Sequence, residues 1–157
     1  MLGRFITRIK NSKYADNTII AVTGDHNFWN ILEYSNERIL DFLSVPLYLY
    51  IPYSLKPKNI DASVFGSHLD IMPTLYNISL SSSQYTAMGQ NLLSKRAEDN
   101  VIFMGSGIVM DKNFVVKYNF YNGESLCYIW NKDKNREIKS SAVANRHKEL
   151  IKHICRQ

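Results

Sequence analysis

The 157-residue sequence has no run that approaches the ~20 apolar residues of a membrane-spanning helix. Its first residues, Met1 to Ile6, mix charged and apolar side chains too early for a secretory signal peptide. The sequence has only two cysteines, Cys127 and Cys155. Their spacing is not that of a metal site, and one possible bridge is not a disulfide framework. These absences exclude a helical span within these residues and a disulfide scaffold. We expect buried or free thiols, and either a cytosolic protein or a piece of a longer chain whose targeting segment is absent.

The net charge is also small, with a formal value of +5 at pH 7. The basic residues lie mainly in 4–13 and 132–152. A basic domain can bind nucleic acid or an anionic membrane surface. Here the aromatic residues fall mostly in apolar strands and form no stacking platform beside the basic ones. We therefore interpret the charge as solvated faces and expect no nucleic-acid partner.

The stretch from Asn17 to His26 organises the chain. Its short apolar run without alternation predicts a strand buried on both faces, followed by Gly24, Asp25 and His26. Ligands of open parallel sheets bind beyond the carboxyl ends of the strands. Carboxylate oxygen and imidazole nitrogen are both good ligands for Zn²⁺ or Mn²⁺. An ordinary strand-to-loop turn is the alternative, and the dipeptide alone leaves both open.

Periodicity predicts the remaining elements up to residue 94. Residues 2–9 read as an amphipathic helix without an N-cap, because Leu2, Phe5, Ile6 and Ile9 recur at helical spacing. A helix over 36–43 precedes a strand over 45–51, and a loop follows over 52–59. Since a helix lies between them, we expect strands 17–23 and 45–51 to pair in parallel. Asp70 is expected to cap a further helix with Pro73 in its first turn, and 79–94 to be mostly irregular.

The pattern changes beyond residue 100. Turn residues separate short apolar runs, which predicts an antiparallel meander with strands at 101–104, 108–110, 114–120 and 126–130. An amphipathic helix is expected from about Ser140 to the end. We expect the meander to pack at one edge of the α/β core.

Two further positions have open interpretations. Trp29, in the aromatic segment after His26, either walls a pocket or simply packs. His68 precedes the predicted helix at Asp70, so it either points into a cleft or is an ordinary loop histidine with a local partner.

Four motifs occur in the order Asp-Asn-Thr-Ile-Ile…Thr-Gly-Asp-His, Val-Pro-Leu-Tyr-Leu-Tyr-Ile-Pro, Ser-His-Leu-Asp-Ile-Met-Pro-Thr-Leu and Gly-Gln-Asn-Leu-Leu. Together they resemble the C-terminal half of the sulfatase-like catalytic domain of the alkaline phosphatase superfamily, nearest to the lipoteichoic acid synthase and phosphoglycerol transferase branch. The resemblance covers residues 5 to about 94. It implies an α/β fold, the C-terminal portion of a three-layer sandwich. Residues 1–94 would carry the metal-ligand motifs, and 95–157 would complete the same domain.

The resemblance assigns roles to individual residues. Asp25 and His26 match the metal ligands, and His68 matches a position that faces metal or phosphate in several branches. Asn27 and Trp29, with His68, are the expected substrate contacts. The cofactor would be a divalent metal ion, Zn²⁺ or Mn²⁺ in preference to Mg²⁺ or Ca²⁺. It would act as a Lewis acid on the phosphoryl oxygen.

This chain also departs from the family pattern. The family's nucleophile is a Thr or Ser (a formylglycine in sulfatases) in the N-terminal half, which is absent here with a further acidic ligand. Thr23 and Thr74 belong to other motifs, so no catalytic nucleophile is expected in this chain. Position 27 is Asn where many relatives have Gly or Tyr. Full-length relatives are anchored in the bacterial membrane with the catalytic domain outside the cytoplasm.

Three hypotheses follow. The first is a segment of a metal-dependent enzyme that transfers or hydrolyses phosphoglycerol, phosphoethanolamine or sulfate esters and is inactive alone. Its partners would be the missing N-terminal half and a phospholipid or glycan substrate. The second is a truncated, non-catalytic remnant that binds a partner. The third is an unrelated basic binding module.

Overall fold

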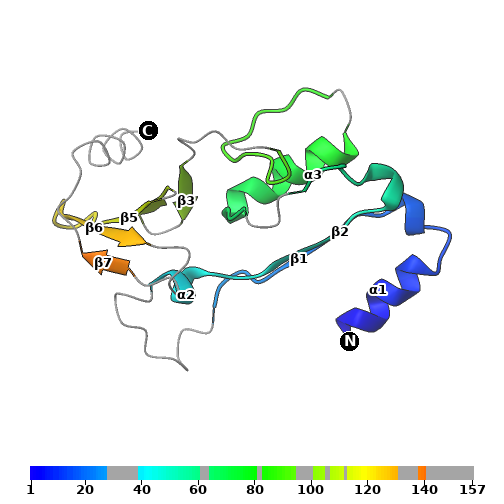
Figure 1. Ribbon diagram of the computed structural model, residues 1–157, viewed down its shortest axis with the longest axis horizontal. Coiled ribbons are helices and arrows are strands. Elements are labelled where there is room, and N and C mark those ends of the chain that lie inside the picture. Colours follow the sequence, from blue (N-terminus) through cyan, green and yellow to red (C-terminus); the bar gives the residue numbers. More distant parts are fainter. Residues whose placement is uncertain are drawn as a thin grey trace. The chain divides into compact units, whose positions relative to one another are not determined.

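The computed structural model describes residues 1–27, 39–60, 64–80, 83–94, 101–104, 107–111, 113–130 and 138–140 (Figure 1). The chain is a mixed α/β protein that divides into two compact units. Unit 1 comprises Met1–Asp25, Val45–Phe65 and Leu69–Lys95, and unit 2 comprises His26–Ser44, Gly66–His68 and Arg96–Gln157. Within the described ranges, no helix has the length and apolar character needed to cross a membrane.

Unit 1 begins with helix α1, Leu2–Lys10, which confirms the predicted helix. No side chain caps its N-terminus, also as predicted. Arg8 and Lys10 lie in the last turn, where cations interact favourably with the helix dipole. The apolar stripe is only partly covered, because Phe5 remains 52% exposed.

The two strands of unit 1 pair antiparallel, so the predicted parallel pairing was wrong. Strand β1, Ile20–Thr23, pairs with β2, Leu47–Tyr50, in the register Ile20↔Tyr50 to Thr23↔Leu47. A parallel pair needs a crossover that returns the chain along the whole strand. The described helix between them, α2 (Ile39–Leu43), has five residues and is about 7.5 Å long. That is shorter than a four-residue strand of about 13 Å.

β1 is also less buried than its apolar sequence predicted. Ala21 and Thr23 are exposed, and Ile20 and Val22 are half-buried. The sheet that contains β1 has two strands among the described residues, so β1 and β2 are both edge strands. The continuous apolar run therefore does not produce a strand buried on both faces within unit 1.

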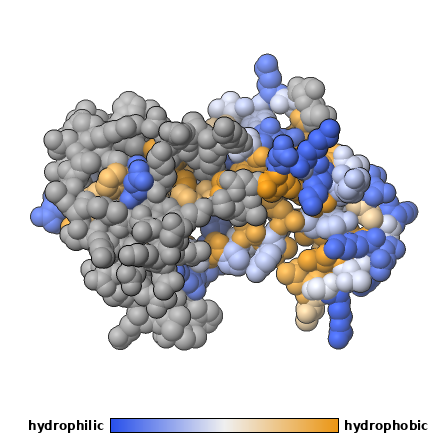
Figure 2. All heavy atoms as spheres, in the orientation of Figure 1, coloured by the Kyte–Doolittle hydropathy of each residue, from blue (hydrophilic) through white to orange (hydrophobic). Residues whose placement is uncertain are grey.

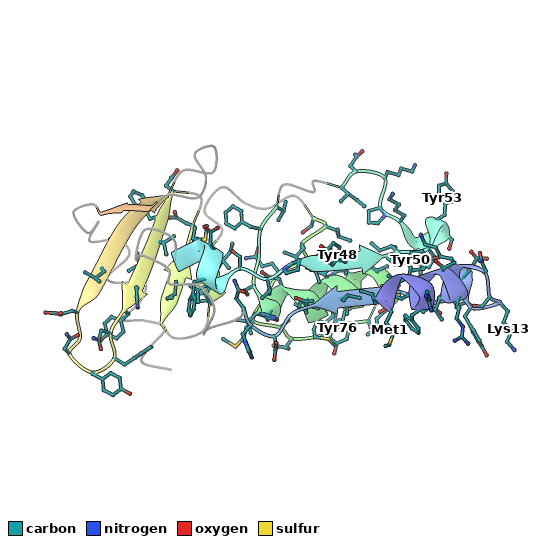
Figure 3. All side chains as sticks on the ribbon, turned by 90° about the horizontal axis from the view of Figure 1, so that it is seen from below. Met1, Lys13, Tyr48, Tyr50, Tyr53 and Tyr76 are labelled. Atoms are coloured by element: carbon teal, nitrogen blue, oxygen red, sulfur yellow. The ribbon has the colours of Figure 1, made fainter. Side chains whose placement is uncertain are left out.

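Helices lie on both sides of the β1–β2 ribbon. Figure 1 shows α3, Ile71–Ser79, on one side and α1 on the other, and in Figure 3 α1 lies in front of the ribbon and α3 behind it. Contacts to Tyr50 identify the face toward α1: its ring lies 5.2 Å from Lys10 Nζ, and its hydroxyl donates to the Ala15 carbonyl at 3.3 Å. The register places Ile20, Val22 and Tyr48 on this same face.

The chain wraps α3 with the irregular segment over 83–94, which matches the predicted loop. Pro73 and Thr74 are buried in the first turn of α3. The Tyr85 hydroxyl donates to the Pro73 carbonyl at 3.2 Å, and the Tyr85 and Tyr76 rings meet edge to face at 5.1 Å. The loop over 52–59 contains a short 3₁₀ helix, η3 (Tyr53–Leu55).

Unit 2 contains an antiparallel meander in which the four predicted strands are confirmed, and a fifth strand, at Ile138–Ser140, was not predicted. Its strands pair in the order β3 (Ile102–Met104), β4 (Ile108–Met110), β5 (Phe114–Tyr118), β6 (Ser125–Trp130) and β7 (Ile138–Ser140). Gly107 and Gly123 supply the positive φ angles of 73° and 71° that two of its turns require.

The core of the meander consists of Val109, Val116 and Cys127. Cys127 is a free, buried thiol, in agreement with the sequence prediction. Cys155 and the helix predicted after Ser140 lie outside the described residues. Packing of the meander against the edge of unit 1 stays a prediction.

Candidate metal centre

The end of β1 presents the two residues that the sequence singled out as metal ligands. β1 ends at Thr23, and Gly24 leads into a bend that carries Asp25 and His26. Both side chains are exposed. Neighbouring oxygen and nitrogen donors at a strand end, reachable from solvent, suit a Zn²⁺ or Mn²⁺ ion.

The imidazole of His26 is oriented by the backbone. Its Nδ1 lies 2.8 Å from the Asn27 carbonyl oxygen, so in the tautomer with hydrogen on Nδ1 this nitrogen donates to that carbonyl. Metal-binding histidines usually donate their second ring N–H to a carbonyl or carboxylate, which fixes the ring and raises its basicity. In this geometry Nε2 is the nitrogen that would coordinate a metal ion.

Asn27 ties this loop to helix α2. Its side-chain Nδ2 donates to the Asp41 carbonyl oxygen at 2.9 Å, and Asn27 is half-buried. This hydrogen bond fixes Asn27, whose own carbonyl oxygen lies at His26 Nδ1. Asn27 therefore joins this loop to α2 and supports His26 through its carbonyl oxygen.

His68 opens a short 3₁₀ helix, η4 (His68–Asp70), that continues into α3. Its side chain is exposed, whereas Asp70 at the other end of η4 is only 5% exposed. The end of η4 at Asp70 is thus the anchored one, and three residues of unit 1 hold it.

Asp70 provides one anchor, and it does not act as predicted. It stands at the N-cap position of α3, but its side chain makes no cap hydrogen bond. Its backbone is already helical (φ −84°, ψ −15°), whereas a capping side chain needs an extended N-cap residue to reach the first helical N–H groups. Its Oδ1 instead accepts the Gln90 N–H at 2.7 Å.

Thr74 provides a second anchor. Its Oγ1 accepts the Leu92 N–H at 2.8 Å and donates to the Asp70 carbonyl at 2.6 Å. Its hydroxyl is thus fully occupied inside unit 1, with the residue only 1% exposed. Thr74 therefore joins α3 to the segment over 89–92.

Gly89 provides a third anchor. A Cβ at this position would lie 2.0 Å from the Leu69 carbonyl oxygen and 2.7 Å from the Asp70 nitrogen. No side chain fits there, so glycine allows the segment over 89–92 to lie directly against η4. The Gly-Gln-Asn-Leu-Leu and Ser-His-Leu-Asp-Ile-Met-Pro-Thr-Leu motifs therefore form one clamp, consisting of Asp70, Thr74, Gly89, Gln90 and Leu92.

Sequence reasoning missed this clamp. Two signals were present: a polar pair four residues apart, Asp70 and Thr74, on a helix face that turns out to be buried, and a glycine within a polar loop. Neither signal identifies its partner, because the partners are backbone groups about twenty residues away.

The structure brings some of the predicted site residues together and leaves others untested. Asp25 and His26 are adjacent, and His26 contacts Asn27. Asp25 belongs to unit 1 and His68 to unit 2, so their convergence stays a prediction. Trp29 lies outside the described residues. Among those described, no three His, Cys, Asp or Glu side chains form a group that could hold a metal ion.

Comparison with known proteins confirms the resemblance. The chain is 29% identical over 142 residues to lipoteichoic acid synthase 1 of Bacillus subtilis (strain 168). This is a distant similarity. The match covers 80% of this chain and 21% of the synthase, so the chain spans about a fifth of the length of its relative. No protein-family profile and no solved structure matches the chain.

Proposed function

We propose that this chain supplies the metal-binding, C-terminal part of a phosphoglycerol-transferase-type active site and that it is inactive alone. The main observation in support is that Asp25 and His26 lie side by side at the end of β1, where Nδ1 of His26 lies within hydrogen-bond distance of the Asn27 carbonyl oxygen. The similarity to a lipoteichoic acid synthase supports the same reaction class. In this proposal the fold is the C-terminal portion of a three-layer sandwich, and β1 and β2 belong to its central sheet.

Asp25 and His26 would hold a Zn²⁺ or Mn²⁺ ion through a carboxylate oxygen and Nε2. When bound, the ion would supply Lewis-acid stabilisation of a phosphoryl oxygen. His68 would contribute a further ligand or contact the phosphate. Asn27 Oδ1 and Trp29 are proposed to contact the substrate, a phosphoglycerol or phosphoethanolamine group on a phospholipid or glycan. A sulfate ester is the alternative substrate.

The nucleophile and remaining ligands would come from the partner half of the domain. Thr23 is on an exposed strand position and its hydroxyl donates to the Gly24 carbonyl at 3.2 Å. Thr74 is buried in the clamp. Neither hydroxyl is proposed as a nucleophile. Two or three ligands are fewer than the four that zinc usually takes, so we expect weak metal binding and no turnover by the chain alone.

Calorimetric titration of the chain with Mn²⁺ and Zn²⁺ tests the proposal. We expect Asp25→Ala and His26→Ala each to weaken binding by about tenfold or more, which corresponds to about 1.4 kcal/mol. Asp16→Ala is the matched control, because Asp16 is an exposed carboxylate in another part of unit 1. Absence of metal binding, or equal affinity in all three variants, would favour the non-catalytic remnant.

Turnover is measured in parallel with a chromogenic phosphodiester and a sulfate ester. No hydrolysis above buffer is expected from the chain alone. Metal-dependent turnover that persists in Asp25→Ala and His26→Ala would place the site elsewhere. Turnover abolished by these changes would show that the chain needs no partner half.

A further inference from the structure

We propose that one end of unit 1 binds the surface of an anionic phospholipid bilayer, as a contact of the folded unit and not of an anchoring helix. Helix α1, the segment from α1 to β1 and the segment after β2 form this end of the unit. We refer to the exposed side chains of residues 2–14 and 53–58 as the basic–aromatic surface.

Positive charge dominates the basic–aromatic surface. Every Lys and Arg in the part of unit 1 that the structure describes lies on it and is exposed, namely Arg4, Arg8, Lys10, Lys13, Lys56 and Lys58. Of the three carboxylates in the same part of the unit, Asp70 is buried and Asp25 follows the other end of β1. Only Asp16, in 3₁₀ helix η1 (Ala15–Asn17), belongs to the segments that form this end. Such an excess of cations attracts an anionic surface.

Contacts of Tyr50 bring the two parts of this surface together. The Tyr50 hydroxyl donates to the Ala15 carbonyl oxygen in η1, and its ring lies 5.2 Å from Lys10 Nζ. Strand β2 ends at Tyr50 and η3 follows closely, so the lysines after η3 extend from the same end of the ribbon. Figure 3 shows Lys13, Tyr50 and Tyr53 at this end.

Helix α1 has the residue pattern of a helix that lies in a membrane interface. Its apolar stripe stays partly exposed, with Leu2 at 46% and Phe5 at 52%. At helical spacing, Arg8 and Lys10 flank this stripe on its two sides. Long basic side chains keep their stems on apolar surface and their charges in water or among headgroups. Amphipathic helices with basic residues beside an apolar face bind anionic bilayers in this way.

Exposed tyrosine and leucine side chains supply further apolar contacts. Tyr53 is 94% exposed, Tyr14 53% and Leu55 41%. Tyrosine is enriched at bilayer interfaces, because its ring is apolar and its hydroxyl stays hydrated. Figure 2 shows hydrophilic and apolar residues side by side over α1 and this end of the ribbon.

The apolar residues favour a bilayer over a nucleic acid or another soluble polyanion. A bilayer interface accepts exposed side chains such as Phe5 and Leu55, whereas a chain of phosphates offers them no apolar contact. Nucleobases stack on open aromatic faces. Lysine ammonium groups already lie over the rings of Tyr14 and Tyr50, each 5.2 Å from the ring centre. Charge alone suits all of these partners, and the apolar side chains select the lipid.

The basic–aromatic surface lies at the opposite end of the ribbon from the candidate metal ligands. Tyr50 pairs with Ile20 at the start of β1, whereas Asp25 follows Thr23 at its end. A strand of this length spans about 13 Å, so a bilayer bound at one end leaves the other end uncovered. Lipid binding and metal binding can therefore be measured separately.

Flotation of the full chain with lipid vesicles in EDTA tests the proposal. The vesicles contain phosphatidylcholine alone or with about one third phosphatidylserine, whose headgroup differs from that of the proposed substrate. We expect binding to the phosphatidylserine vesicles to be about tenfold tighter or more, and to weaken about tenfold between ~0.1 M and ~0.5 M NaCl. Lys13→Ala and Lys56→Ala should each weaken binding about fivefold. Tyr53→Ser should weaken it about threefold.

Matched substitutions in unit 2 are the controls. Lys117→Ala removes an exposed lysine and Tyr121→Ser a fully exposed tyrosine. Each should leave binding within about twofold of the unsubstituted chain, because both lie outside the basic–aromatic surface. Lys56→Arg keeps the positive charge and should bind as the unsubstituted chain does.

Absence of binding, equal binding to neutral and anionic vesicles, or equal losses in the variants of both units would each overturn the proposal. Soluble polyphosphate that displaces the vesicles completely, with normal binding by Tyr53→Ser, would also overturn it, because that result identifies a polyanion site. EDTA removes metal ions, so failure here leaves the calorimetric test of Asp25 and His26 unaffected.

Discussion

The backbone N–H of Gln90 donates to the Asp70 carboxylate at 2.7 Å, and this contact joins two sequence motifs twenty residues apart. Asp70 is the last residue of η4, which begins at His68. A buried carboxylate that accepts a backbone N–H stabilises the packing of the two segments, because a buried N–H without an acceptor is costly. The clamp therefore fixes the end of η4 at Asp70 within unit 1.

Loss of the Asp70 carboxylate should destabilise unit 1. Asp70→Ala removes a charged hydrogen bond at a buried position, which we expect to lower the free energy of unfolding by about 2 kcal/mol. Asp16→Ala, at an exposed site, should change it by less than about 0.5 kcal/mol. Urea denaturation monitored by circular dichroism gives both values. Equal stabilities for the two variants would mean that the Gln90 contact contributes little.

A pair of glycine substitutions tests the close approach in the clamp. Gly89→Ala would place a Cβ 2.0 Å from the Leu69 carbonyl oxygen, so the segment over 89–92 must shift. We expect a loss of about 2–3 kcal/mol in the free energy of unfolding. Gly3→Ala is the control, since no atom lies within 4 Å of its Cβ position. Gly3 is in helix α1, where alanine should stabilise by about 0.5–1 kcal/mol. A Gly89→Ala chain as stable as the original would show that the two motifs do not pack this closely in solution.

We test whether Asn27 supports His26 by removing the side-chain amide N–H of Asn27. Asn27→Ala and Asn27→Asp both lose the N–H that reaches the Asp41 carbonyl. We expect Mn²⁺ affinity to fall about tenfold in both, as for other residues that orient a metal-binding histidine. Circular dichroism should show an unchanged fold. Asn17→Ala, at an exposed position in 3₁₀ helix η1 (Ala15–Asn17), should bind as before. Unchanged affinity in both Asn27 variants would assign that residue no role in positioning His26.

Convergence of His68 with Asp25 and His26 can be measured directly. Sharing one cleft requires the His68 ring to lie within about 10 Å of the Asp25 carboxylate, since paired metal ions are separated by ~4 Å and first-coordination bonds are ~2 Å. Mn²⁺ bound at Asp25 and His26 would then broaden the NMR signals of the His68 ring. Asp25→Ala should remove that broadening. Sharp His68 signals under saturating Mn²⁺, or a separation near 20 Å in an experimental structure, would remove His68 from the site.

The sequence by itself determined the local elements and which polar side chains follow one strand. The 3.6-residue spacing of Leu2, Phe5, Ile6 and Ile9 predicted α1, and turn residues around Gly107 and Gly123 predicted the meander, because both signals act over a few neighbouring residues. The placement of Asp25 and His26 directly after a strand was also correct. The order of the four motifs predicted the similarity to lipoteichoic acid synthases.

Only the tertiary structure decided how distant segments meet. The direction of β2 depends on the path of the chain between Thr23 and Leu47, and an apolar strand sequence is compatible with either direction. The carboxylate of Asp70 could cap α3 or bind a distant N–H, and its helical backbone together with the close approach at Gly89 selected the second. These outcomes depend on backbone groups that have the same chemistry at every residue, so no pattern of side chains specifies them.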